Sequence, residues 1–369
     1  MDSEKKNIAF LINGLQAGGA ERVVVTLANF FVNTYNVNII KKNSGRSFYE
    51  IHPDIKVHTL TNTIQNSTNL ISAIYGNFKL IIGIKRICKL QNIDILIGFT
   101  TTSSVLAILV AKSLNIPSII SERNNPIVVP PNLFWQFLRN RTYKTADFLV
   151  VQTNANKSFF SQYIDNEKIR VILNPISEDI ISHKNRPTSN KEKIILNVGR
   201  LNNNKAQDVL IKAFANIPNN DWKLILVGDG PKIEEYKKLA FELGVSSNVI
   251  FTGNIANVQD YYSRASIFAF TSQSEGLPNA LMEAMYYGLP CISTNCPNGP
   301  SDLITTNENG ILIPVGNHYE LSEQLKLLIN KPKLRSKLGK NALKTSKAFE
   351  LEQITNQWNN LILSSLKEN

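Results

Sequence analysis

Short apolar runs alternate along the chain with segments in which apolar residues recur every three or four positions. In the first half, the runs that predict strands are 8–12, 37–40, 56–60, 93–97, 118–121 and 148–151. The periodic segments that predict helices are 20–31, 70–90, 103–114 and 133–145. This alternation is typical of βαβ units, in which helices cover both faces of a parallel sheet.

The pattern stops at Asn174-Pro175, and a polar stretch over 177–193, rich in Asn, Lys, Ser and Pro, predicts a linker. The strands predicted beyond it are 194–198, 223–227, 248–251, 267–270, 291–293 and 310–313. The helices predicted there are 206–215, 233–243, 279–287, 319–328, 333–348 and 351–366. The alternation therefore starts a second time.

These two series predict an α/β protein with two doubly wound, Rossmann-like domains in tandem, residues 1–176 and 177–349. In such folds, ligands bind outside the carboxyl ends of the strands. If the two domains face one another, one site is expected in the cleft between them.

The charge of the chain is unevenly distributed. Of the net charge of +11, residues 1–187 carry +9 and residues 188–369 carry +2. A basic first domain suggests an anionic partner: a membrane surface, a polyprenyl diphosphate or a nucleic acid. Because the basic residues form no dense run and no nucleic-acid motif is present, we expect no nucleic acid among the partners.

The three cysteines, Cys88, Cys291 and Cys296, are too few for a disulfide framework and indicate a reducing compartment. Neither a secretory signal nor a transmembrane helix is evident, so we expect a cytoplasmic protein. The four histidines show no metal-ligand spacing, and the sequence Asp-x-Asp does not occur. We therefore predict neither a metal nor another cofactor.

Glycines follow the first predicted strand in the sequence GLQAGGAE, residues 14–21. Gly18 and Gly19 would let the backbone approach a ligand closely, and the helix that follows would favour an anion at its N-terminus. The spacing does not match the dinucleotide-binding G-x-G-x-x-G. A tight strand-to-helix turn without a ligand explains the same residues.

Two further clusters follow strands of the second domain. Arg200 and Lys205, in GRLNNNK, place two positive charges at a strand end, where they suit a diphosphate or form a solvated basic loop. Glu275 and Glu283, in SEGLPNALMEA, stand toward one side of the first half of a predicted helix. Carboxylates accept hydrogen bonds from sugar hydroxyls, but a helix cap and a solvated Glu are also common.

Taken together, the motifs GLQAGGAE, GRLNNNK, VGDGP at 227–231 and SEGLPNALMEA resemble glycosyltransferase family 4, in which they occur in this order. The resemblance spans nearly the whole chain. Through AGGAERVVVTLAN, IISE, LNP and SEGLPN it extends to members that elongate polyprenyl-diphosphate-linked oligosaccharides, such as the GalNAc transferase of bacterial N-glycosylation.

The resemblance implies a GT-B fold in which the last helix, residues 350–369, packs back onto the first domain. It implies an acceptor-binding first domain and a second domain that binds a nucleotide sugar, with UDP as the expected nucleotide.

The resemblance also implies the role of each motif residue. Arg200 and Lys205 would bind the donor diphosphate and stabilise the leaving group, Glu275 would hold sugar hydroxyls and Glu283 the ribose. Gly18 and Gly19 would close over the diphosphate. The other donor-binding residues that it implies are Ile255 at the base and Gly276, Leu277, Pro278 and Asn279 around the sugar and distal phosphate.

The sequence departs from the family in the loop after the fifth strand, where many relatives carry a histidine. This chain has Glu122 and Arg123 there. We therefore expect a donor phosphate oxygen to take the acceptor proton, with Glu122 as the alternative base. This chemistry agrees with the retaining outcome that the resemblance implies.

The function predicted is a metal-independent, retaining transfer of a hexose or N-acetylhexosamine to a lipid-linked or soluble glycan, in surface polysaccharide or glycoprotein glycan synthesis. The alternatives are a nucleotide-sugar epimerase of the same fold and a non-enzymatic, basic nucleic-acid-binding protein.

Two segments mix basic and apolar residues at helical spacing, which is typical of helices that lie in an anionic membrane interface. They are 80–90, with Lys85, Arg86 and Lys89, and 134–143, with Trp135, Phe137, Arg139 and Arg141. We therefore expect peripheral contact with the cytoplasmic face of the inner membrane. The same aromatic residues would also suit the core of the first domain.

Overall fold

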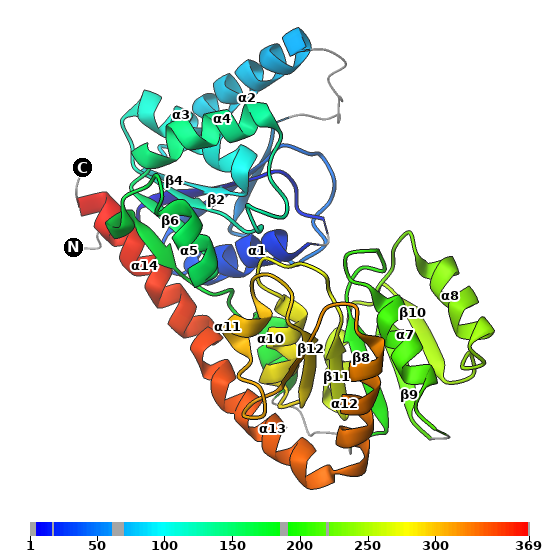
Figure 1. Cartoon of the computed structure of the whole chain (residues 1–369). Helices are drawn as coiled ribbons and strands as arrows, with labels where there is room; N and C mark the ends of the chain where they lie inside the picture. Colours follow the sequence, from blue (N-terminus) through cyan, green and yellow to red (C-terminus); the bar gives the residue numbers. More distant parts are fainter. Residues whose placement is uncertain (1–4, 17, 61–69, 185–190, 219–220, 368–369) are drawn as a thin grey trace. The chain divides into compact units, whose positions relative to one another are not determined.

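The computed structural model of the chain describes residues 5–16, 18–60, 70–184, 191–218 and 221–367. The chain divides into two compact units: unit 1 is Met1–Ser177 with Leu351–Asn369, and unit 2 is Glu178–Glu350. Each unit is built on one parallel sheet (Figure 1). The predicted fold class, two Rossmann-like α/β domains, is confirmed.

The sheet of unit 1 has seven parallel strands in the order β3-β2-β1-β4-β5-β6-β7. Their bounds are β1 Asn7–Ile12, β2 Asn36–Lys41, β3 Lys56–Thr59, β4 Ile95–Phe99, β5 Ser118–Ser121, β6 Phe148–Val151 and β7 Ile169–Val171. The helices of this unit are α1 Gly19–Phe31, α2 Leu70–Leu90, α3 Thr101–Leu114, α4 Leu133–Thr142, α5 Asn154–Phe160 and α14 Leu351–Lys367. Short 3-10 turns follow at Tyr143–Thr145 and Asn166–Lys168.

Strand β1 shows why its residues form a buried strand. Its side chains alternate between two cores: Ile8, Phe10 and Ile12 pack with α1 and α14 on one face. Ala9 and Leu11 pack with α2 and α3 on the other face. A strand covered on both faces needs apolar residues at every position, which is the continuous run seen in the sequence.

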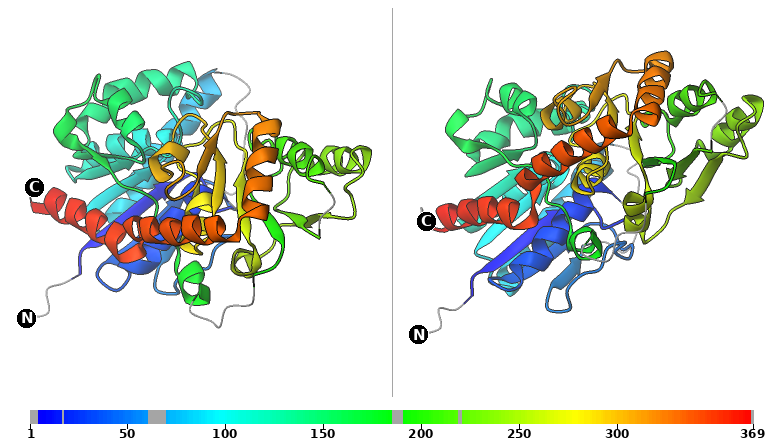
Figure 2. Two further views of the ribbon diagram at one scale, coloured as in Figure 1. Left: turned by 60° about the horizontal axis from the view of Figure 1, so that its bottom comes forward. Right: turned by 90° about the horizontal axis from the view of Figure 1, so that it is seen from below.

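The helix α14 supplies unit 1 with its largest buried side chain. Trp358 is fully buried, and its ring stacks on Phe99 at the end of β4, with 5.6 Å between ring centroids. Ile354 and Ile362 of the same helix join the core that contains β1 and α1. Residues 351–367 therefore complete the first sheet's covering, and they can be followed in red in Figure 2.

Unit 2 has six parallel strands in the order β10-β9-β8-β11-β12-β13. Their bounds are β8 Ile194–Val198, β9 Lys223–Val227, β10 Val249–Gly253, β11 Ile267–Phe270, β12 Cys291–Thr294 and β13 Ile311–Ile313. The helices are α6 Glu178–Lys184, α7 Gln207–Ala215, α8 Ile233–Glu242, α9 Val258–Arg264, α10 Asn279–Tyr286, α11 Pro300–Leu303, α12 His318–Asn330 and α13 Pro332–Thr345. A 3-10 turn at Ser346–Phe349 ends this unit.

The predicted linker over 177–193 requires a correction, because its first part is the helix α6. Ile180 of this helix is fully buried, and its carbonyl accepts a hydrogen bond of 3.1 Å from the hydroxyl of Tyr287. Asp179 accepts another, of 3.0 Å, from Gln259. The helix therefore belongs to unit 2. Residues 185–190 of the predicted linker lie outside the described residues.

The strand order of each sheet reverses direction at one point. In unit 1, β1 lies between β2 and β4, and in unit 2, β8 lies between β9 and β11. The loops that follow β1 and β4, or β8 and β11, then leave the sheet in opposite directions and open a space at the carboxyl ends of the strands. These two positions are where ligand-binding residues are expected.

The stacked position of Trp358 yields a test of the fold. Trp358→Ala removes a fully buried aromatic ring and should lower the free energy of unfolding by about 3–5 kcal/mol. Leu363→Ala, on an exposed position of the same helix, should change it by less than about 0.5 kcal/mol. The measurement is urea unfolding followed by circular dichroism. Equal midpoints for the two variants would contradict the central role of Trp358.

Candidate active site

The loop between β8 and α7 is shaped by two local features. The side chain of Asn202 accepts a hydrogen bond of 2.9 Å from the backbone amide of Lys205. Ala206, the residue before α7, adopts the left-handed backbone conformation, with φ of 47°. Such a conformation is strained for a residue other than glycine, and strain of this kind is often found at functional sites. The turn fixes the backbone from which Lys205 extends.

The motif VGDGP, at the end of β9, makes backbone contacts with the loop between β8 and α7. The amide of Leu201 donates a hydrogen bond of 2.9 Å to the carbonyl of Asp229. A Cβ atom at Gly230 would lie 2.2 Å from the carbonyl oxygen of Leu201, and Gly228 has φ of 133°. Glycine is thus required at positions 228 and 230, because the backbone of VGDGP lies directly against the backbone of the loop after β8. The motif positions the loop of Arg200 and Lys205.

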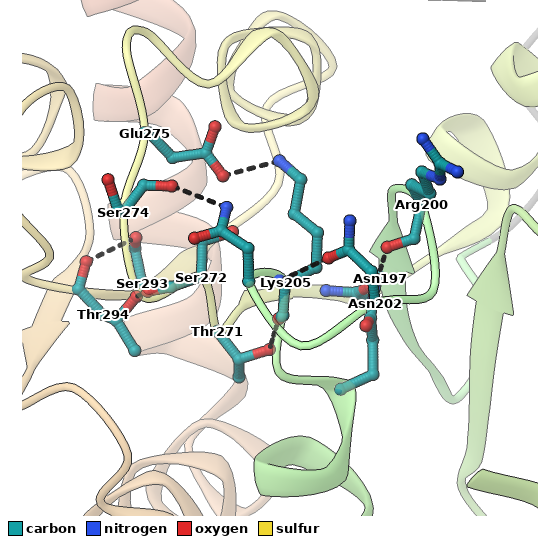
Figure 3. A network of polar contacts seen from close by, with 12 residues as sticks. Asn197, Arg200, Asn202, Lys205, Thr271, Ser272, Ser274, Glu275, Ser293 and Thr294 are labelled. Carbon is teal, nitrogen blue, oxygen red and sulfur yellow. Dashed lines mark hydrogen bonds and ion pairs between the residues drawn. The ribbon is translucent and has the colours of Figure 1, made fainter. Parts of the chain in front are cut away.

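The structure brings Lys205 and Glu275 together at the point where the strand order reverses. The distance from Lys205 Nζ to Glu275 Oε1 is 2.6 Å, and the two side chains are 23% and 12% exposed. Figure 3 shows the two side chains pointing toward one another from the loops after β8 and β11. The ammonium group also lies 5.0 Å from the centre of the Phe270 ring.

The same two loops are joined along their backbones. The amide of Gln273 donates to the carbonyl of Asn204 at 2.7 Å. The side chain of Asn204 donates to the carbonyl of Ser274 at 2.9 Å. Thr271 Oγ1 donates to the carbonyl of Lys205 at 2.9 Å (Figure 3). Lys205 and Glu275 therefore extend from a connected frame.

Glu275 precedes the turn of Gly276, Leu277 and Pro278, after which the helix α10 begins at Asn279. Leu277 and Pro278 are buried, and Gly276 and Asn279 are partly exposed. Within the part of the chain that the structure describes, the amide groups of Gly276 and Leu277 donate to no other protein group. A Cβ atom at Gly299 would lie 2.7 Å from Pro278, so this glycine permits close packing against the turn. Amides at a helix N-terminus, with the helix dipole, suit an anion.

Glu283 lies inside α10 and is 4% exposed. It is therefore more enclosed than Glu275, and the two carboxylates do not share one open face. Arg200 is exposed, and among the described residues none accepts a hydrogen bond from its guanidinium group. Its side chain lies apart from the Lys205–Glu275 pair in Figure 3. Ile255, in the loop after β10, is half-buried.

In unit 1, Gly18 and Gly19 stand at the start of α1, while Ala17 lies outside the described residues. The hydroxyl of Tyr49 lies 3.3 Å from the amide nitrogen and 3.1 Å from the carbonyl oxygen of Gly18. A Cβ atom at Gly18 would lie 2.2 Å from a carboxylate oxygen of Glu21. Because this oxygen is the far end of a flexible side chain, Glu21 could move aside, and the contact does not by itself require glycine at position 18.

The structure adds polar residues at the reversal point of unit 1 that the sequence analysis did not single out. Asn13, after β1, contacts the hydroxyls of Thr100 and Ser103 at 3.4 Å and 3.3 Å. Thr100, after β4, has φ of 70° and ψ of 158°, a conformation that is rare outside glycine. Asn13 directly follows the predicted strand 8–12, which was an available signal, whereas Thr100 lies three positions beyond the predicted strand 93–97 and follows directly only the observed β4.

Glu122 lies in the interior of unit 1. Its carboxylate accepts a hydrogen bond from the hydroxyl of Tyr143, and burial raises the pKa of Glu122. The residue is 2% exposed. A general base needs an oxygen within reach of the acceptor hydroxyl, so this position does not suit the base for which Glu122 was proposed. A structural role beside Tyr143 suits it better.

Arg123 is also buried, with its guanidinium group 4.8 Å from the centre of the Phe99 ring. Its Nη1 donates a hydrogen bond of 2.7 Å to the side chain of Asn174. Burial lowers the pKa of Arg123 to about 9. At the position where many relatives carry a histidine, this chain therefore has a cation that is packed against the core.

The described residues do not form a metal cluster. No group of three or more His, Cys, Asp or Glu side chains that could hold a metal occurs among them. A hollow of about 330 Å³ lies at the amino ends of β1, β2 and β3, with Asn7, Asn36 and Lys56 among its lining residues. This hollow therefore lies at the end of the sheet opposite to the carboxyl ends of the strands, where ligand-binding residues are expected.

Comparison with known proteins agrees with this geometry. Residues 17–180 match the family Glycosyltransferase Family 4, and residues 179–345 match Glycosyl transferases group 1. The solved structure of sucrose-phosphate synthase from Thermosynechococcus elongatus has a TM-score of 0.81 at 19% identity, covering 99% of this chain and 100% of that one. HepE from Anabaena, solved with UDP and glucose, has a TM-score of 0.78 at 20% identity, covering 97% and 99%.

A curated relative shows the family more directly. The chain is 33% identical over 359 residues to GalNAc-alpha-(1->4)-GalNAc-alpha-(1->3)-diNAcBac-PP-undecaprenol alpha-1,4-N-acetyl-D-galactosaminyltransferase of Campylobacter jejuni subsp. jejuni. The alignment covers 96% of this chain and 98% of that protein. Similarity of this extent, together with the two family matches, shows that the chain belongs to glycosyltransferase family 4, a family of retaining enzymes, and that it is a glycosyltransferase.

Proposed function

We propose that this glycosyltransferase moves an N-acetylhexosamine or hexose from a UDP-sugar to a glycan carried on a polyprenyl diphosphate. The observation that carries the proposal is the pairing of Lys205 with Glu275 beside the start of α10, where the strand order of unit 2 reverses. Here a cation, a carboxylate and helix amides suit a diphosphate that bears a sugar. The Campylobacter relative, named for a GalNAc transfer to an undecaprenol-linked glycan, and HepE, solved with UDP, support the choice of substrates.

In this proposal, the donor diphosphate is held by positive groups of the protein. Lys205 and the exposed Arg200 supply fixed charges, and the amides of Gly276 and Leu277, in the turn just before α10, donate hydrogen bonds. Groups arranged in advance around a developing negative charge stabilise a leaving group strongly. They would take the electrostatic role that a divalent metal has in other transferases.

The reaction would break the bond between the anomeric carbon and the distal phosphate oxygen. An acceptor hydroxyl oxygen would form the new bond on the same face of the sugar, and its proton would move to an oxygen of the leaving diphosphate. The donor then supplies its own base, which agrees with the burial of Glu122 and Arg123. The protein then contributes by binding the donor and the acceptor and by orienting them for the transfer.

The other donor contacts follow the family resemblance. We assign Glu275 to hydroxyls of the transferred sugar, Glu283 to the ribose and Ile255 to the base, with Pro278 and Asn279 shaping the turn around the sugar. Gly18 and Gly19 of unit 1 are assigned to the diphosphate. The burial of Glu283 means that a ribose would meet it only at an edge of its carboxylate.

A lipid-linked acceptor requires the enzyme to reach a membrane surface, and unit 1 has a face that suits one. The loop before α4 and the helix itself expose apolar side chains: Ile127, Val128, Val129, Leu133, Phe134 and Phe137. On α2, Phe78, Ile82 and Leu90 are exposed with Arg86 and Lys89. We call these residues of α2, α4 and the preceding loop the apolar-basic face.

The charge of this face matches an anionic bilayer. Neither 70–93 nor 123–146 contains an acidic residue. Each Lys or Arg near an anionic surface contributes about 1 kcal/mol to binding, and apolar side chains that enter the interface add to it. No described helix is long and apolar enough to cross a bilayer. We therefore propose peripheral binding at the cytoplasmic face of the inner membrane.

The structure corrects two residues of the membrane hypothesis. Arg139 is buried, with its guanidinium group 5.5 Å and 5.6 Å from the centres of the Phe159 and Phe160 rings. Trp135 is half-buried and packs into the core of unit 1. Arg141, in contrast, is exposed and lies 5.0 Å from the ring centre of Phe137. Leu133, Phe137 and Arg141 are therefore the residues of α4 to test.

Lys205 provides the first test of the donor site. Lys205→Ala should lower kcat by roughly a hundredfold or more, because the charge that stabilises the leaving group is lost. Lys212→Ala removes a lysine from the exposed ion pair with Asp208 on α7 and should leave kcat unchanged. Transfer from UDP-GalNAc to a polyprenyl-diphosphate-linked glycan is measured. A Lys205 variant with near-normal kcat would exclude it from the mechanism.

The absence of a metal requirement is tested separately. Because Lys205, Arg200 and the α10 amides supply the positive charge, the rate of transfer should be unchanged in excess EDTA. The measurement is the initial rate with EDTA, and again after Mg²⁺ or Mn²⁺ is added back. Complete loss in EDTA with recovery by either ion would overturn the metal-independent mechanism.

The membrane proposal is tested with a matched pair of variants. Leu133→Asp with Phe137→Asp places two charges on side chains that are 84% and 55% exposed, so the fold should persist. Co-sedimentation with vesicles of phosphatidylglycerol and phosphatidylcholine should weaken at least about tenfold, since two apolar contacts are lost. Phe241→Asp, at a 78% exposed position of α8, is the control and should bind as the wild type.

Salt separates the two contributions to membrane binding. Sedimentation of the wild type with the anionic vesicles should fall as salt is raised, because the basic residues are screened. Equal sedimentation with anionic and with pure phosphatidylcholine vesicles, or none with either, would contradict the apolar-basic face and favour a soluble acceptor.

A further inference from the structure

The lysine assigned to the donor diphosphate already has an anionic partner within the protein. Glu275 Oε1 lies 2.6 Å from Lys205 Nζ, and both side chains are largely withdrawn from solvent. Charges at this distance interact more strongly in a partly buried site than at the surface, because water screens them less. An anion that approaches Lys205 must therefore also interact with Glu275.

Lys205 and Glu275 are positioned by hydrogen bonds of their loops as well as by their mutual ion pair. Lys205 starts from a backbone that Asn202 and Thr271 hold by hydrogen bonds. Glu275 follows Ser274, whose carbonyl accepts from Asn204. Because the frame joins both loops, a ligand phosphate bound to Lys205 would remain a few ångströms from the carboxylate of Glu275.

The substrate and the product of the proposed reaction differ in charge at this position. In a nucleotide sugar, the distal phosphate is linked by an anhydride to the proximal phosphate and by an ester to the sugar, and it carries one negative charge. In the nucleoside diphosphate product it is a terminal phosphate, which carries about −1.5 to −2 charge at pH 7. The additional charge appears on the phosphate that Lys205 is proposed to hold, beside Glu275.

We propose that Glu275 discriminates between the nucleotide-sugar donor and the nucleoside diphosphate product. With the sugar present, its carboxylate accepts hydrogen bonds from hydroxyls, and during transfer it faces a sugar that carries partial positive charge. Once the sugar has left, the same carboxylate faces a terminal phosphate and repels it. The residue thus promotes binding of the donor and release of the product.

This inference rests on the proposed function, and its test is an isosteric substitution. Glu275→Gln keeps the size and one hydrogen-bond acceptor but removes the charge. Calorimetric titration with UDP should show affinity about tenfold higher than that of the wild type, because the repulsion is lost. The affinity for UMP, which has no distal phosphate, should change by less than about twofold. UDP-GalNAc should bind equally well or more weakly, and kcat should fall.

Two controls make the result specific. Asp208→Asn removes one carboxylate from an ion pair in the same unit, with Lys212, and should leave all three affinities unchanged. Glu275→Ser removes the charge without an amide and should also bind UDP more tightly than the wild type. The melting temperature of each variant reports its folding.

The outcomes separate this inference from the proposed function. If the wild type binds UDP and UDP-GalNAc but neither Glu275 variant binds UDP more tightly, the discrimination by Glu275 is wrong and the donor site stands. If UMP affinity rises as much as UDP affinity, the effect is not directed at the distal phosphate, and the inference fails. If the wild type binds neither UDP nor UDP-GalNAc, both proposals fail.

Discussion

A parallel sheet buries its strands on both faces, and this constraint determines where polar chemistry can occur in the protein. The strands themselves are filled with apolar side chains, as β1 illustrates. Clusters of polar groups are favoured where the strands end, and above all where neighbouring loops turn to opposite sides. In unit 2 this point lies between β8 and β11, and the loops after these two strands supply Lys205 and Glu275.

The same constraint explains how much of the fold the sequence predicts. Strands covered on both faces appear as continuous apolar runs, so β8 and β11 are predicted with their observed bounds. The short β7 contains Arg170 and escapes the pattern. Helix α6 is missed because its contacts within unit 2 come from distant residues such as Tyr287, which is more than one hundred positions away in the sequence. Local patterns carry no information on such contacts.

For the site, residue type and spacing predict the participants but not their contacts. A strand end followed by Lys205, and a helix start preceded by Glu275, could each be recognised alone. Their pairing across 70 positions depends on the order of the strands. The burial of Arg139 escaped prediction for a similar reason: the helix α5, which carries Phe159 and Phe160, was not foreseen. The burial of a side chain cannot be predicted when its neighbours belong to a helix or strand that the sequence pattern does not reveal.

Unit 1 is formed from two separated stretches of the chain, and this affects the order in which the protein can fold during synthesis. The ribosome delivers residues 178–350, which form all of unit 2, before it delivers Trp358. Until then the sheet of unit 1 lacks the ring that covers Phe99 and exposes apolar surface that can associate with other chains. The half of the protein that is made first is therefore completed last, and its apolar surface stays open to such association until Trp358 has been synthesised.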